Sequence, residues 1–110
     1  MMRANQTTTF ADIQKILDDA VQNEDIGSHG PFWRGISRDQ FVVKKVFGCQ
    51  IILTEDGKFV GPKSPLVRIL QASIECPVGR TRPQMPFGFP ALPGDKIQVI
   101  SDWIDAQCPA

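Results

Sequence analysis

The feature that most limits the fold of this 110-residue chain is a proline-rich stretch just before its last amphipathic segment. Between Glu75 and Pro93 the prolines are Pro77, Pro83, Pro86, Pro90 and Pro93. Proline fixes φ and lacks a backbone N–H, which keeps it out of helix interiors and central strands. A loop of this length in a compact domain is usually functional or wraps a ligand. We therefore predict a rigid loop that carries Met85 and leads into a terminal helix.

Apolar residues at helical spacing predict the helices of the chain. The expected helices cover about residues 9–22, 38–47, 65–73 and 95–106. Thr9 and Ser37 are the expected N-caps of the first two, the second as part of a capping box. Ser64 should cap the third, with Pro65 at the first helical position. We expect the first and last helices to pack across each other.

One segment between the second and third helices has a different pattern. Asp56-Gly57 is the signal of a tight two-residue turn, with Ile51–Leu53 before it and Phe59-Val60 after it. We expect a short hairpin there, or an extended loop with one such turn. The predicted fold class is therefore all-α with one short β-hairpin, in a single domain over residues 1–110 whose residues 1–8 are loose.

Composition and charge exclude several function classes. Twelve basic and twelve acidic residues cancel, which gives no broad attraction to nucleic acid or to an anionic membrane. No apolar run approaches the roughly 18 residues of a membrane span. The first residues lack the apolar core of a secretory signal, so we expect a cytoplasmic location.

The cysteines Cys49, Cys76 and Cys108 form an odd set without a short-spaced pair. This excludes a thioredoxin-like motif and a zinc ribbon. We expect reduced, structural thiols, and the alternative is a Cys76–Cys108 bridge in an exported protein.

Catalytic motifs are missing from the sequence. With His29 as the one histidine and no patterned carboxylates, a Ser-His-Asp or Cys-His arrangement has little support. No glycine-rich loop followed by Lys-Ser or Lys-Thr is present to hold a phosphate. These observations favour a protein that is not an enzyme.

The order of helix, His-containing loop, short helices, Met loop and terminal helix resembles class I c-type cytochromes, in particular planctomycete-type bacterial ones. The Ser64–Leu70 segment and the Asp102-Trp103-Ile104-Asp105 run are similar to the corresponding parts of that family. The family attaches haem through Cys-any-any-Cys-His after the first helix. The same place here reads Asp25-Ile26-Gly27-Ser28-His29.

The resemblance implies a cytochrome c-like fold without covalent haem. His29 matches the proximal ligand and Met85 the second axial ligand, while both attachment cysteines are replaced. Removal of haem would leave a cavity, which destabilises a fold. We therefore expect Phe32, Trp33, Phe87 and Phe89 to fill the space of the porphyrin, with no cofactor bound.

The expected function of such a haem-free module is protein–protein contact, as a partner or accessory domain of an oxidoreductase. The alternative is an electron carrier that binds haem non-covalently through His29 and Met85. A variant of it is a copper site at these two residues and one cysteine, since soft sulfur ligands suit Cu(I). Arg34, Arg80 and Arg82 would then pair with haem propionates; otherwise they are solvated surface charges.

Overall fold

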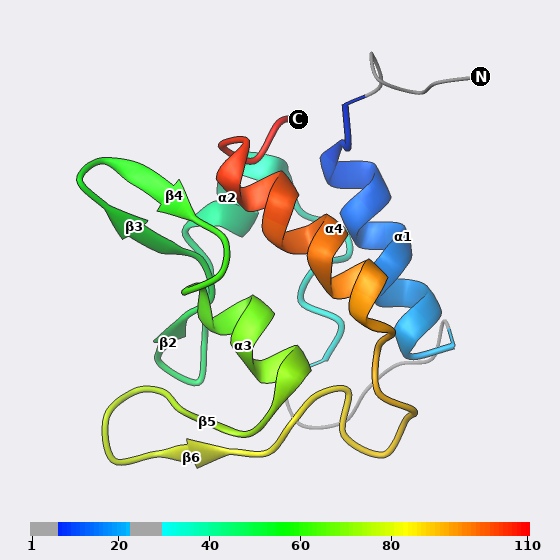
Figure 1. Cartoon of the computed structure of the whole chain (residues 1–110), viewed down its shortest axis with the longest axis vertical. Coiled ribbons are helices and arrows are strands. Elements are labelled where there is room, and N and C mark those ends of the chain that lie inside the picture. Colours follow the sequence, from blue (N-terminus) through cyan, green and yellow to red (C-terminus); the bar gives the residue numbers. More distant parts are fainter. Residues whose placement is uncertain (1–6, 23–29) are drawn as a thin grey trace.

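The computed structural model describes residues 7–22 and 30–110. In this part of the chain, helices hold 36% of the residues and short strands 14%. The helices are α1 (Phe10–Ala20), α2 (Arg38–Val42), α3 (Pro65–Gln71) and α4 (Gly94–Asp105) (Figure 1). The strands form three antiparallel pairs: β1 (Lys45–Val46) with β2 (Cys49–Gln50), β3 (Leu53–Glu55) with β4 (Lys58–Val60), and β5 (Ile74–Glu75) with β6 (Thr81–Arg82).

The predicted all-α class is therefore wrong, because three small sheets accompany the helices. The hairpin expected around Asp56-Gly57 is present as β3–β4, and both turn residues have positive φ (53° and 79°). A second tight turn at Phe47-Gly48, with φ of 52° and 78°, joins β1 to β2. Positive φ at both positions is what a two-residue turn of this kind requires.

The second helix is shorter than predicted because the β1–β2 hairpin takes the place of its expected last residues. It ends at Val42, and Lys45 onward pairs with the chain after the turn instead of continuing the helix. The β5–β6 pair, apart from Ile74, lies inside the stretch predicted to be a loop. Pro77 and Pro83 lie outside its paired residues, so the ladder does not need their missing N–H groups.

The predicted N-cap residues are confirmed for the first three helices. Thr9 and Ser37 both form capping boxes, with Asp12 and Gln40 respectively. Ser64 occupies the N-cap position of α3 but makes no cap hydrogen bond. Its buried hydroxyl instead donates to the carbonyl of Val60 (2.6 Å) and accepts from the N–H of Leu53 (2.9 Å). This serine joins the β3–β4 hairpin to the start of α3.

The core includes buried side chains of both α1 and α4, which lie side by side in Figure 1. The ring of Phe10 on α1 stacks at 6.1 Å on Trp103 of α4, and Phe41 of α2 lies 5.1 Å from Phe10. The most deeply buried large side chains are Ile13, Phe41, Ile52, Val67, Ile100, Trp103 and Ile104. No helix within residues 7–22 and 30–110 is long and apolar enough to cross a membrane.

Candidate functional site

An open apolar cavity of about 370 Å³ lies between the end of α1, the β1–β2 hairpin, α3 and the proline-rich loop. This volume falls in the range of roughly 300–1,000 Å³ that is usual for small-molecule sites. Among the described residues, the lining is apolar apart from one arginine. Its residues are Leu17, Ala20, Val21, Phe32, Trp33, Val46, Phe47, Cys49, Ile51, Pro65, Leu66, Ile69, Leu70, Ile74, Arg82, Pro83, Met85, Pro86 and Phe87.

Two helices supply part of the lining. Leu17 and Ala20 of α1 and its C-cap Val21 are spaced i, i+3 and i+4, and Leu66, Ile69 and Leu70 repeat this spacing on α3. Each set therefore lies on one face of its helix. Ala20 is the smallest residue of its set, and its methyl group leaves room that a larger side chain would occupy.

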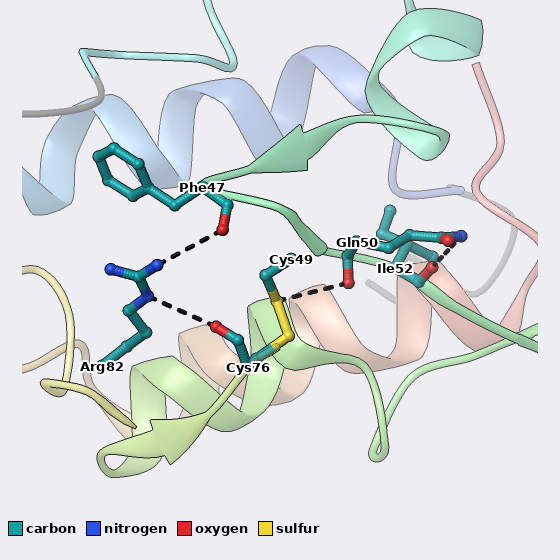
Figure 2. The surroundings of a disulfide bond; sticks show 6 residues. All are labelled: Phe47, Cys49, Gln50, Ile52, Cys76 and Arg82. Atoms are coloured by element: carbon teal, nitrogen blue, oxygen red, sulfur yellow. Dashed lines mark hydrogen bonds between the residues drawn. A yellow bond between two sulfur atoms is a disulfide. The ribbon is translucent and has the colours of Figure 1, made fainter. Parts of the chain in front are cut away.

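A disulfide between Cys49 and Cys76 joins β2 to the residue that follows β5 (Figure 2). The expectation of reduced thiols is wrong for these two residues, and the alternative Cys76–Cys108 pairing is wrong as well. Cysteine spacing alone does not reveal connectivity, which explains the error. Cys49 lines the cavity, so the disulfide connects its wall to the β5–β6 hairpin.

Cys108 is the remaining cysteine, free and buried beside Trp103 at the end of α4. Burial raises the pKa of its thiol to about 11, although the nearby charge of Arg38 lowers it. A thiol of this kind is inert near neutral pH. It takes no part in the cavity.

Arg82 is the only charged residue among the described residues that line the cavity. Figure 2 shows its guanidinium group between two backbone carbonyls, those of Cys76 and Phe47, each at 3.4 Å. Both bonds are longer than the usual 2.7–3.2 Å. The guanidinium carbon also lies 5.0 Å from the centre of the Phe47 ring. Within the described ranges, Arg82 forms no ion pair with a carboxylate.

Met85 lines the cavity, and its backbone N–H donates to the carbonyl of Ile69 on α3 at 2.8 Å. Next to it, the side-chain amide of Gln84 donates to the carbonyl of Leu70 at 3.1 Å. These bonds hold the proline-rich loop against α3. The predicted partner of Met85, His29, falls outside the residues that the structure describes.

The predicted pocket-filling aromatics occupy different places. Phe32, Trp33 and Phe87 line the cavity, whereas Phe89 packs against the core and does not line it. Trp33 is buried, Phe32 half-buried, and Phe87 is 72% exposed at the rim. Around these rings the cavity stays open.

Trp33 is held in place by Asp18 on α1. The indole N–H donates to Oδ1 of Asp18 at 2.7 Å, and Nε of Arg34 donates to the same oxygen at 2.6 Å. Burial raises the pKa of Asp18, but the hydrogen bonds from Arg34 and Trp33 outweigh it, and the pKa ends below its ordinary value. Arg34 is thus engaged with Asp18, and the exposed Arg80 does not line the cavity.

Metal ligands are sparse around the cavity. The described residues contain no cluster of three His, Cys, Asp or Glu side chains. Of the cysteines expected for a copper site, Cys49 and Cys76 share their disulfide and have no thiolate to offer. Apart from the disulfide sulfur of Cys49, the thioether of Met85 is the one soft metal ligand among the described lining residues.

Comparison with known proteins returned no match among protein-family models, curated proteins or solved structures. The cytochrome resemblance therefore stays a prediction.

Proposed function

We propose that this protein is a non-catalytic binding module whose cavity takes up the apolar part of a ligand. The cavity itself is the observation that carries the proposal, because its size and apolar lining are those of a ligand site. The described side chains that line it offer no nucleophile with an adjacent base. Binding without chemistry is therefore the activity that this arrangement supports best.

The walls of the cavity are held before any ligand arrives. The disulfide fixes β2 to the β5–β6 hairpin, and the hydrogen bonds of Gln84 and Met85 fix the proline-rich loop to α3. A preformed site has less conformational entropy to lose when it binds. This rigidity favours affinity for a small ligand.

Fluorescence titration with N-phenyl-1-naphthylamine, a neutral apolar dye, tests the proposal. We expect saturable binding to the wild type and its loss in Ala20→Phe, where the ring occupies the cavity. Ala11→Phe is the matched control, because Ala11 is exposed on the same helix and does not line the cavity. Equal binding by all three proteins, or by none, would refute the proposal.

Non-covalent haem is a second candidate, favoured by the place of Met85 on the cavity wall. The thioether of Met85, the apolar walls and the guanidinium of Arg82 fit an iron ligand, a porphyrin and a propionate respectively. Bound haem would supply one-electron transfer. Addition of haemin to the purified protein tests this candidate: a Soret band lost in Met85→Ala supports it, and a colourless protein rejects it.

The expected protein partner, an oxidoreductase among others, also remains a proposal. Phe47 and Phe87 are 49% and 72% exposed at the rim of the cavity and offer apolar surface to such a partner. A pull-down from the native source with wild type and with Phe87→Ala tests it: specific capture that weakens in the variant supports contact at this rim. The cytoplasmic location likewise stays a prediction, and the disulfide weighs against it because such bonds persist mainly in oxidising compartments.

A further inference from the structure

We infer that the ligand of the cavity is an aliphatic monocarboxylate, with its hydrocarbon chain between α1 and α3 and its carboxylate on the guanidinium of Arg82. This inference rests on the proposed function, because it names the chemical class that the cavity binds.

The positive charge of Arg82 in the lining favours an anionic ligand. Arg82 is the only charged residue among the described residues of the lining, and no described carboxylate pairs with it. Its two bonds to carbonyl oxygens are long, at 3.4 Å, and leave most of its N–H groups without a partner among the described residues. The planar guanidinium binds a carboxylate with two parallel hydrogen bonds. A cationic ligand would be repelled at this position.

The apolar walls favour a ligand whose hydrocarbon chain carries no further polar group. None of the described lining residues is a Ser, Thr, Asn, Gln, His, Asp or Glu. The indole N–H of Trp33 is already taken by Asp18, and Cys49 is in the disulfide. A second polar group on the ligand would lose its hydrogen bonds to water and find none in return. One carboxylate at the rim and hydrocarbon inside is therefore the composition that matches.

The affinity should depend on the chain length and the head group of the ligand. Each methylene added to the chain should tighten binding about fourfold, until the chain no longer fits inside. A carboxylate should bind about tenfold more tightly than the alcohol of the same chain length, as expected for a hydrogen-bonded charge. Added salt should reduce this preference, because the pair lies at a partly exposed rim.

Competition against bound N-phenyl-1-naphthylamine provides the test, with decanoate, decanol and decyltrimethylammonium below their micellar concentrations. In the wild type we expect decanoate to displace the dye at the lowest concentration and decyltrimethylammonium at the highest. In Arg82→Gln, decanoate should become no better than decanol, while decanol competes as before. Unchanged decanol competition shows that the variant is folded and its cavity intact.

Arg80→Gln is the matched control, because Arg80 is exposed on the same hairpin and does not line the cavity. It should keep the preference for decanoate. Equal loss in both variants, or equal competition by decanoate and decanol in the wild type, would overturn the inference and leave the proposed function standing. Failure of the dye to bind would instead refute the proposed function, and the inference with it.

Discussion

The indole Nε1 of Trp33 donates a hydrogen bond to Oδ1 of Asp18, and the two atoms lie 2.7 Å apart. The side-chain amide of Gln14 donates to the backbone carbonyl of Trp33 at 2.7 Å. Two residues of α1 thus hold Trp33 by its ring and by its main chain. Because Trp33 lines the cavity, these bonds position one of its walls.

Replacement of Asp18 by Ala should lower the free energy of unfolding by about 1–2 kcal/mol at neutral pH, because Trp33 and Arg34 lose a charged acceptor. The pKa of Asp18 is lower in the folded protein than its ordinary 3.8. Its contribution should be complete above about pH 4 and disappear as the pH falls through the folded pKa. Urea denaturation across pH measures both effects.

The control for this prediction is Asp19→Ala. Asp19 is exposed, and among the described residues its carboxylate pairs only with the exposed Lys15. Its loss should change stability by less than about 0.5 kcal/mol. If both variants are equally stable at neutral pH, the hydrogen bonds of Asp18 to Trp33 and Arg34 do not stabilise the fold as proposed.

Loss of the Cys49–Cys76 disulfide should lower the free energy of unfolding by about 3–4 kcal/mol, the chain-entropy value for a closed loop with a sequence separation of 27. Urea denaturation of the wild type with and without a reductant measures it. The double variant Cys49→Ala/Cys76→Ala is the control and should not respond to the reductant. A wild type that is indifferent to the reductant would contradict the pairing.

Cys108 should react with a thiol reagent only when the protein unfolds, because its side chain is buried and its pKa is about 11. A thiol count should find none in the folded protein and one after denaturation without reductant. The raised pKa also predicts that stability falls as the pH rises from about 9 towards 11, since the unfolded chain releases this proton first. Rapid labelling at neutral pH would show that Cys108 is accessible.

Gly61→Ala should destabilise the protein by about 1–3 kcal/mol through overpacking. A Cβ atom at Gly61 would clash with the backbone carbonyl of Ser101 and lie 2.7 Å from its Oγ, where the chain after β4 meets α4. Gly94→Ala is the control, because a Cβ there meets nothing within 4 Å and its φ is not in the left-handed region. Thermal unfolding should separate the two variants clearly, and equal melting temperatures would contradict the close contact.

Local signals in the sequence predicted much of the fold. The N-cap at Thr9, the capping box at Ser37, the Asp56-Gly57 turn and the apolar stripes of α1 and α4 depend on neighbouring residues alone. These are interactions that a sequence displays directly. The all-α prediction was wrong because it missed strands that have a distant pairing partner or only a weak sequence pattern. The β5–β6 pair is an example, since each of its strands is two residues long.

The candidate site was less predictable. Met85, Phe32, Trp33, Phe87 and Arg82 were singled out from the sequence, and all five line the cavity. That a cavity stays open among them depends on how helices α1 and α3 are spaced, which no local pattern encodes. Small Ala20 among larger residues of the same stripe is the one signal that could have indicated it.

The most direct test of the account is a methyl-resolved NMR titration with decanoate, because it locates the ligand as well as detecting it. We expect saturable shifts of the methyl signals of Met85, Ile69 and Leu17, which line the cavity. Ile100 and Ile104, buried in the core on α4 and outside the lining, should not move. Absence of saturable shifts at Met85, or shifts of equal size at Ile100 and Ile104, would contradict the claim that this cavity is a binding site.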